Sequence, residues 1–144
     1  MGSASAGSVQ ESMKLFSPEK ANALISKVAP LMDELWAKRR DLAIRLLEAD
    51  PVLRGIEPTP HSRMATPRSP FTPGRFSEQK GEIVRLINRI EAYGCIVKDI
   101  DLGLVDFPSM REGRTIYLCW KNGEQRIAHW HGMDETFADR KPLE

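Results

Sequence analysis

The chain is poor in the features that define several protein classes. Two cysteines among 144 residues are too few for a disulfide scaffold, so a reducing cytoplasm is the expected location. It lacks an apolar run of the roughly 18–20 residues that a membrane-spanning helix needs. The opening residues, MGSASAGSVQES, lack the apolar core of a secretory signal. The formal net charge of +1 does not indicate a nucleic-acid binder.

Familiar catalytic motifs are missing as well. The sequence has no phosphate-binding glycine loop, no paired-histidine zinc helix and no serine nucleophile elbow. These absences leave open whether the protein is an enzyme. The remaining signals concern architecture and a few candidate side chains.

Composition divides the chain into a short tail and one domain. Residues 1–15 are small and polar, which predicts a disordered tail or a cloning remnant. Residues 16–144 have about the length of a single domain. Within that domain, residues 51–75 hold six of the ten prolines. This stretch predicts a flexible, Pro-rich linker with an extended tendency.

Two helices are predicted on either side of this linker. The first runs from Pro18 to Glu48, because Ser17 can cap it and apolar residues then follow at alternating steps of four and three. The second begins at Ser77 and ends before Gly94, a natural terminator. They are predicted to pair antiparallel. The second is about half as long, so part of the first helix's apolar stripe lacks a partner within the chain.

Three strands are predicted after the helices. Alternating apolar residues mark Ile96–Leu104, and further strand-like runs lie at Thr115–Trp120 and Gln125–Trp130. The last two flank Asn122-Gly123, a strong hairpin signal. The predicted fold class is α+β: a long antiparallel helical hairpin with a Pro-rich connection, packed against a small three-stranded antiparallel sheet.

The predicted hairpin also fixes which side chains share a face. A two-residue turn at Asn122-Gly123 would pair Leu118 with Ile127, which places both histidines of the second strand beside Leu118. Cys119 would then lie on the opposite face and would not meet either histidine unless a bulge intervenes. A cysteine–histidine nucleophilic pair built on Cys119 is therefore not expected.

The sharpest site hypothesis is a metal bound by His129 and His131. Two imidazoles two residues apart on a strand point the same way, about 7 Å apart, and can share a metal ion. A third ligand would come from Asp134, Glu135, Asp106 or Asp101. The alternative is that His131 ends the strand and donates a hydrogen bond to a neighbouring carbonyl or carboxylate.

A second hypothesis is a small-ligand site on the His131 side of the hairpin. Arg114 ends a predicted tight loop at 108–114, where arginines can hold a phosphate or carboxylate. His131, Asp134, Glu135 and Asp106 would complete it. The alternative is that the charged residues form surface pairs.

Several blocks of the chain resemble a known family. These blocks are FSPEKANALI, GCIVKDIDLGLVDFPS, GRTIYLCW, GE, and WH followed by TFADRKPL. They resemble the uncharacterised prokaryotic family known as domain of unknown function 2203, over Phe16–Glu48 and Ile83–Leu143. The resemblance implies a bacterial protein of the architecture above, and it brings no activity, cofactor or partner.

The leading functional hypothesis is a small cytoplasmic module that forms a homodimer or binds a partner protein, because the first helix has surplus apolar length. The alternative is a metal- or anion-binding protein, or an enzyme, with its site around the C-terminal hairpin. No cofactor is predicted under the leading hypothesis, and a divalent metal belongs to the alternative. Nucleic acid and membrane are not expected as partners.

Overall fold

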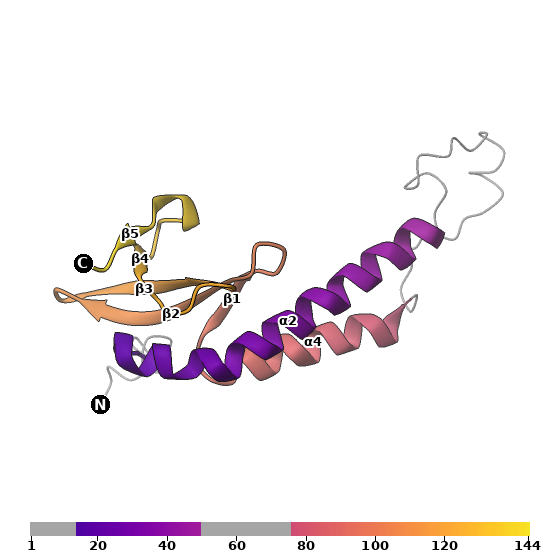
Figure 1. The fold of residues 1–144 in the computed structure, drawn as a ribbon, viewed down its shortest axis with the longest axis horizontal. Coiled ribbons are helices and arrows are strands. Elements are labelled where there is room, and N and C mark those ends of the chain that lie inside the picture. The colour runs from indigo at the N-terminus through magenta and orange to yellow at the C-terminus, as the bar shows by residue number, and fades with distance from the viewer. Residues whose placement is uncertain (1–13, 50–75) are drawn as a thin grey trace, which may run out of the picture.

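A computed structural model describes residues 14–49 and 76–144. The predicted linker at 51–75, and all but the last two residues of the predicted tail at 1–15, lie outside these ranges. The described residues form two helices on one side of an antiparallel sheet (Figure 1). The predicted α+β class is thus confirmed in its broad outline.

The first helix, α2 (Pro18–Ala49), begins at the predicted residue and ends one residue later than predicted. Ser17 Oγ accepts a hydrogen bond from the Lys20 N–H at 3.1 Å, which satisfies one free donor of the first turn. Pro18 occupies the first helical position, where no backbone N–H is needed. At ~1.5 Å per residue the helix is about 48 Å long.

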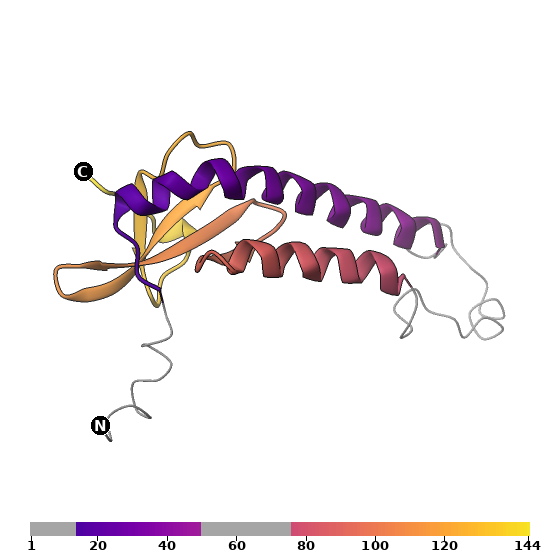
Figure 2. The same ribbon diagram turned by 90° about the horizontal axis from the view of Figure 1, so that it is seen from below.

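The second helix, α4 (Ser77–Glu91), lies alongside α2 and runs antiparallel to it (Figure 2). The chain leaves it through Gly94, whose φ of 106° suits a glycine terminator. The buried residues of α2 all lie between Ala21 and Leu35. No residue from Trp36 to Ala49 is buried by the described part of the chain.

The described residues build a sheet of five strands, and the predicted number of three was wrong. The strands lie side by side in chain order and pair antiparallel. Their bounds are β1 Ile96–Asp99, β2 Leu104–Arg111, β3 Arg114–Lys121, β4 His129–Gly132 and β5 Lys141–Pro142. A 3-10 turn, η1 (Phe137–Asp139), connects β4 to β5.

The tight hairpin lies between β2 and β3 and not at Asn122-Gly123. Arg111 pairs with Arg114 across a two-residue loop. Its residues, Glu112 and Gly113, have φ of 51° and 80°, the pattern of a type I′ turn. The predicted loop at 108–114 is therefore mostly strand. A turn does form at Asn122-Gly123, but an irregular segment at 124–128 follows it before β4 begins.

Pro108 explains why β2 was missed, since proline inside a central strand is unusual. The carbonyl of Pro108 points away from β3 and accepts a hydrogen bond from the Phe16 N–H at 2.7 Å. A residue's N–H and C=O point to the same side of a strand, so the missing N–H of Pro108 also lies on that side. There β1 has already ended, because its pairing stops at Asp106. The proline thus removes no bond between strands.

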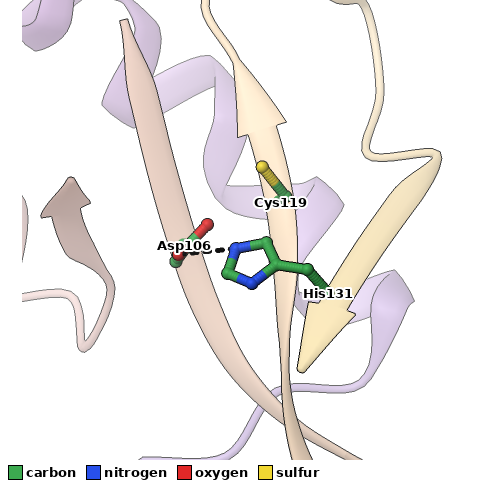
Figure 3. Close-up of side chains that lie close together, drawn as sticks. All are labelled: Asp106, Cys119 and His131. Carbon is green, nitrogen blue, oxygen red and sulfur yellow. Dashed lines mark hydrogen bonds and ion pairs between the residues drawn. The ribbon is translucent and has the colours of Figure 1, made fainter. Parts of the chain in front are cut away.

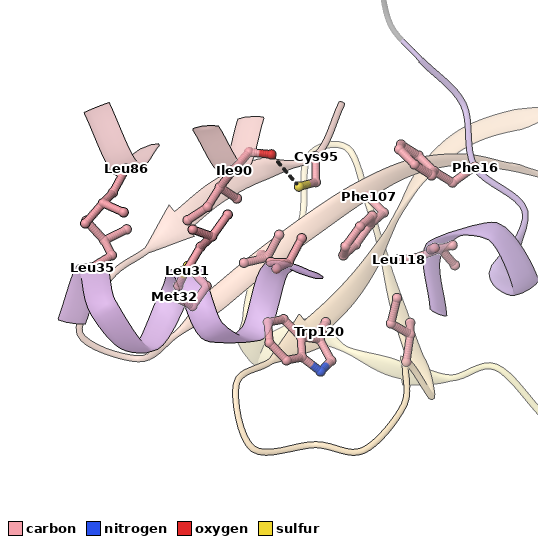
Figure 4. Packing of buried hydrophobic residues seen from close by; sticks show 14 of the residues in the cluster. Phe16, Leu31, Met32, Leu35, Leu86, Ile90, Cys95, Phe107, Leu118 and Trp120 are labelled. Atoms are coloured by element: carbon pink, nitrogen blue, oxygen red, sulfur yellow. Dashed lines mark hydrogen bonds between the residues drawn. The ribbon is translucent and has the colours of Figure 1, made fainter. Parts of the chain in front are cut away.

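The core lies between the helices and one face of the sheet (Figure 4). Phe107 and Trp120 are its largest fully buried side chains. Phe107 meets Phe16 edge to face, with ring centroids 5.4 Å apart. Other contributions from the sheet and helices include Val105, Leu118, Val28, Met32, Leu35, Leu86 and Ile90. This core covers one face of the sheet, and its opposite face carries the polar residues described below.

Among the described helices, none is long and apolar enough to cross a membrane.

Candidate metal centre

Three polar side chains converge on the face of the sheet that points away from the helices. Asp106 comes from β2, Cys119 from β3 and His131 from β4 (Figure 3). Asp106 pairs directly with Cys119 across β2 and β3, while His131 pairs with Tyr117, two residues from Cys119. All three residues share this face because side chains alternate along each strand. We call this group the Asp-Cys-His cluster.

The hydrogen bonds of His131 determine where its protons lie. Nε2 is 3.0 Å from Asp106 Oδ2, and Nδ1 is 2.9 Å from the Gly132 carbonyl oxygen. A carbonyl oxygen can only accept, so Nδ1 carries a proton and donates it. One further proton lies between Nε2 and Oδ2, on either atom. The pair therefore has the same net charge in both arrangements.

The cluster is nearly closed to solvent. The exposed fractions are 1% for Asp106, 1% for Cys119 and 3% for His131. Burial raises the pKa of the Asp106 carboxyl, and the nearby charges of His131 and Lys98 oppose that rise. Burial and the neighbouring Asp106 also raise the pKa of the Cys119 thiol to about 12, against the opposing effect of Arg140.

This geometry does not suit a cysteine nucleophile activated by His131. A catalytic pair needs an imidazole nitrogen that accepts the thiol proton. Both ring nitrogens of His131 are already engaged, one by Gly132 and one by Asp106. With its raised pKa, the Cys119 thiol is also protonated at neutral pH.

The cluster does have the donors of a metal site. One ligand atom from each of Asp106, Cys119 and His131 lies within 4.8 Å of the other two. Asp106 Oδ1 is buried and accepts no hydrogen bond from any described residue. A carboxylate, a thiol and an imidazole together form a donor set that suits zinc and related transition metals.

A cavity of about 440 Å³ opens onto the cluster. Asp106, Cys119 and His131 all line it. Its other walls come from β1 and the turn after it, the start of β2, and the segment around η1: Lys98, Asp99, Leu102, Leu104, Glu135, Thr136, Phe137 and Ala138. A small molecule in this cavity would touch the cluster directly.

The predicted ligand-site residues divide between this cavity and a neighbouring groove. Asp106 and His131 line the cavity, whereas Arg114 and Asp134 line the groove, an open space of about 1230 Å³ beside the β2–β3 hairpin. Glu135 borders both. Its carboxylate pairs with Lys141 and accepts a hydrogen bond from the Gly132 N–H, and these contacts lower its pKa.

His129 lies outside the Asp-Cys-His cluster, although it was predicted as a ligand with His131. It pairs with Cys119 across β3 and β4, so it shares the cluster's face of the sheet. Its Nδ1 is buried and has no hydrogen-bond partner among the described residues. Of the other carboxylates considered as a third ligand, Asp101 is exposed and pairs with Arg39.

Cys119 was the residue that sequence reasoning excluded, and the reason is the register of β3 and β4. Leu118 pairs with Trp130 and not with Ile127, a shift of three residues along the chain. An odd shift turns every side chain of a strand to the other face. The histidines therefore lie on the face of Cys119, and Trp130 joins the helix-facing side with Leu118 and Trp120.

An ion pair next to the Asp-Cys-His cluster stabilises the segment between β3 and β4, whose conformation was predicted wrongly from the sequence. Arg140 Nη2 lies 2.9 Å from Glu124 Oε2, and Glu124 Oε1 accepts the Lys121 N–H at 2.9 Å. Burial alone would raise the pKa of Glu124, but the bonds from Arg140 and Lys121 outweigh it and hold this pKa below its usual range. The pair ties the turn after β3 to the chain just before β5.

Comparison with protein-family models matches residues 14–143 to the family described as "Uncharacterized conserved protein (DUF2203)". The chain belongs to this family. The match confirms the resemblance drawn from the sequence blocks, and the whole Asp-Cys-His cluster lies within it. Neither the curated proteins nor the solved structures gave a match. The DUF2203 description names no activity, so a function must be argued from the site.

Proposed function

We propose that this DUF2203 protein binds a transition-metal ion, zinc by preference, at Asp106, Cys119 and His131. The observation that carries the proposal is the convergence of three donor atoms from three adjacent strands to within 4.8 Å of one another. Zinc–ligand bonds of 2.0–2.3 Å in a tetrahedron put donor atoms about 3.3–3.8 Å apart. Small side-chain rotations would bring the three donor atoms from their present separations to this spacing.

The surroundings of the donors support this assignment. Asp106 Oδ1 is buried without a hydrogen bond from the described residues, and such an atom costs about 1–3 kcal/mol. A bound cation would satisfy it. The Nδ1 hydrogen of His131 bonds the Gly132 carbonyl, as the outer nitrogen of a metal-bound histidine commonly does. The metal would take the place of the proton shared between Nε2 and Oδ2.

The donor chemistry favours zinc over harder cations. Calcium and magnesium take oxygen ligands, whereas a thiolate and an imidazole favour zinc or another late transition metal. Cys119 and the Asp106–His131 pair would each lose one proton on binding, so the thiolate and the carboxylate would balance a divalent ion. Cys119 must remain reduced for this role, which fits the proposed cytoplasmic location and the two free cysteines.

The test is the metal content of protein purified without chelators or a metal-affinity step. We expect one zinc ion per chain by native mass spectrometry and elemental analysis. Cobalt substituted into the same site should give the charge-transfer absorption of a cobalt–thiolate bond. Cys119→Ser should remove that absorption and most of the bound metal.

Cys95→Ser is the matched control for this experiment. Cys95 is also a buried free thiol, but it lies among the core residues and its Sγ donates to the Ile90 carbonyl. Its replacement should leave the metal content unchanged. A wild-type protein that takes up neither zinc nor cobalt would show that the cluster is a purely structural polar network.

Self-association is a second candidate, supported by the far end of the helical hairpin. The described part of the chain buries no residue of α2 beyond Leu35, and three large apolar side chains there, Trp36, Ile44 and Leu47, are more than 40% exposed. Val84 of α4 is 53% exposed. A second copy of the chain would cover this surface at about 25 cal/mol per Å² of apolar area.

Light scattering during size-exclusion chromatography tests this candidate directly. We expect a dimer at micromolar concentration and a shift toward monomer in Ile44→Asp. Ser26→Asp, a change at another exposed position of the same helix, is the control and should leave the dimer intact. A monomeric wild-type protein would remove the candidate.

A further inference from the structure

We propose that the cavity in front of the Asp-Cys-His cluster binds a small molecule with an apolar body and one carboxylate group. The carboxylate would lie between Lys98 and the metal ion. This inference rests on the proposed function, because the metal supplies half of the recognition.

The cavity in front of the Asp-Cys-His cluster contains a cationic side chain. Lys98 is the basic residue in its lining. The Lys98 ammonium lies 4.7 Å from the centre of the Tyr117 ring and makes no hydrogen bond or ion pair with the described residues. No described carboxylate is therefore in ion-pair contact with it, although its charge acts on Asp106 from a longer distance. A cationic group in this position is available to an incoming anion.

The acids in the same lining are already engaged. Asp99 Oδ1 accepts the Leu102 N–H at 2.9 Å and closes the turn between β1 and β2. Glu135 is held by the Gly132 N–H and by the Lys141 ammonium. Neither carboxylate pairs with Lys98. With Asp106 and Cys119 balancing a divalent metal, Lys98 would be a cationic side chain of the lining that is in ion-pair contact with no described carboxylate.

The shape and polarity of the cavity define the rest of the ligand. About 440 Å³ is within the usual range for small-molecule sites. Leu102, Leu104 and Phe137 line part of it and suit an apolar body. Apolar walls also exclude water, which strengthens attraction between an anion and Lys98. One lysine and one metal position suit a single carboxylate.

The experiment uses benzoate as the probe and benzamide as its uncharged counterpart of the same shape. Both are titrated into the zinc-loaded full-length protein by isothermal calorimetry. We expect benzoate to bind at least tenfold more tightly than benzamide. Lys98→Gln should weaken benzoate binding at least tenfold, while Lys27→Gln, exposed on α2 and outside the cavity, should leave it unchanged.

Three results would overturn the inference: equal binding of benzoate and benzamide, no effect of Lys98→Gln, or binding of inorganic phosphate without benzoate. Zinc content, measured on each sample, separates this failure from that of the proposed function. If the protein takes up no zinc, the titration is repeated without metal. Benzoate binding that depends on Lys98 would then still support the ligand class, and its absence would reject it.

Discussion

Replacing Asp106 with asparagine should separate the stability of the site from its ability to bind metal. In the metal-free protein, Asp106 Oδ2 and His131 Nε2 share one proton at 3.0 Å. An asparagine amide can donate its own N–H to Nε2 and keep this hydrogen bond, because Nδ1 already carries the other ring proton. The amide is neutral, however, and is a poorer metal ligand than a carboxylate.

The size of the two effects follows from burial. Asp106→Asn keeps the hydrogen bond and leaves one amide hydrogen without an acceptor, so the cost should be about 1 kcal/mol. His131→Ala instead strands a buried carboxylate and should cost about 3–5 kcal/mol. For a domain of this size, 1 kcal/mol corresponds to a Tm change of about 2–8 °C. Zinc affinity should fall at least about tenfold in Asp106→Asn.

Thermal unfolding of the metal-free proteins and zinc competition titrations measure the two effects separately. Asp101→Asn is the control, since it is the same chemical change at an exposed carboxylate paired with Arg39, and it should change stability by less than about 1 kcal/mol. The shared-proton reasoning would be refuted if Asp106→Asn were as unstable as His131→Ala. Unchanged zinc affinity would show that Asp106 is not a ligand.

Three further predictions concern the rest of the fold. Phe107→Ala should lower the free energy of unfolding, measured by chemical denaturation, by about 3–5 kcal/mol, because Phe107 is fully buried against Phe16. A loss below about 1 kcal/mol would contradict this packing. Glu124→Gln should lower the free energy of unfolding by about 1–2 kcal/mol at neutral pH. The pKa of Glu124 is lower in the folded protein, so its ionised carboxylate stabilises the fold at pH values above the pKa it has in the unfolded chain. This difference should vanish as the pH falls through the folded pKa of Glu124, and a difference that persists in acid would argue against the ion pair. In a Cys119→Ser variant, Cys95 of the folded protein should resist alkylation at pH 8, because burial raises the pKa of its thiol from 9.0 to about 12. Labelling is measured by mass spectrometry, and rapid labelling would contradict this prediction.

The helices were predictable because their signals are local. Ser17 and Pro18 fix the start of α2, and Gly94 follows α4 with the positive φ that glycine tolerates. Strand β2 was not predictable in the same way, since Asp106 and Pro108 argue against a buried central strand. Each is tolerated for a tertiary reason, namely the His131 partner for the carboxylate and the Phe16 segment beside the proline.

The site depends on the three-residue shift in the pairing of β3 with β4, which no local sequence pattern predicts. The segment at 124–128 supplies the three extra residues, and its conformation is held from both sides. The Trp120 indole donates to the Glu124 carbonyl at 2.9 Å, and Asn22 of α2 accepts the Ile127 N–H at 2.7 Å. A two-residue hairpin would have sent both histidines into the helix-facing core and left Cys119 and Asp106 without them. The contact with α2 therefore selects the register that assembles the Asp-Cys-His cluster, so the helical layer determines the chemistry of the sheet's opposite face.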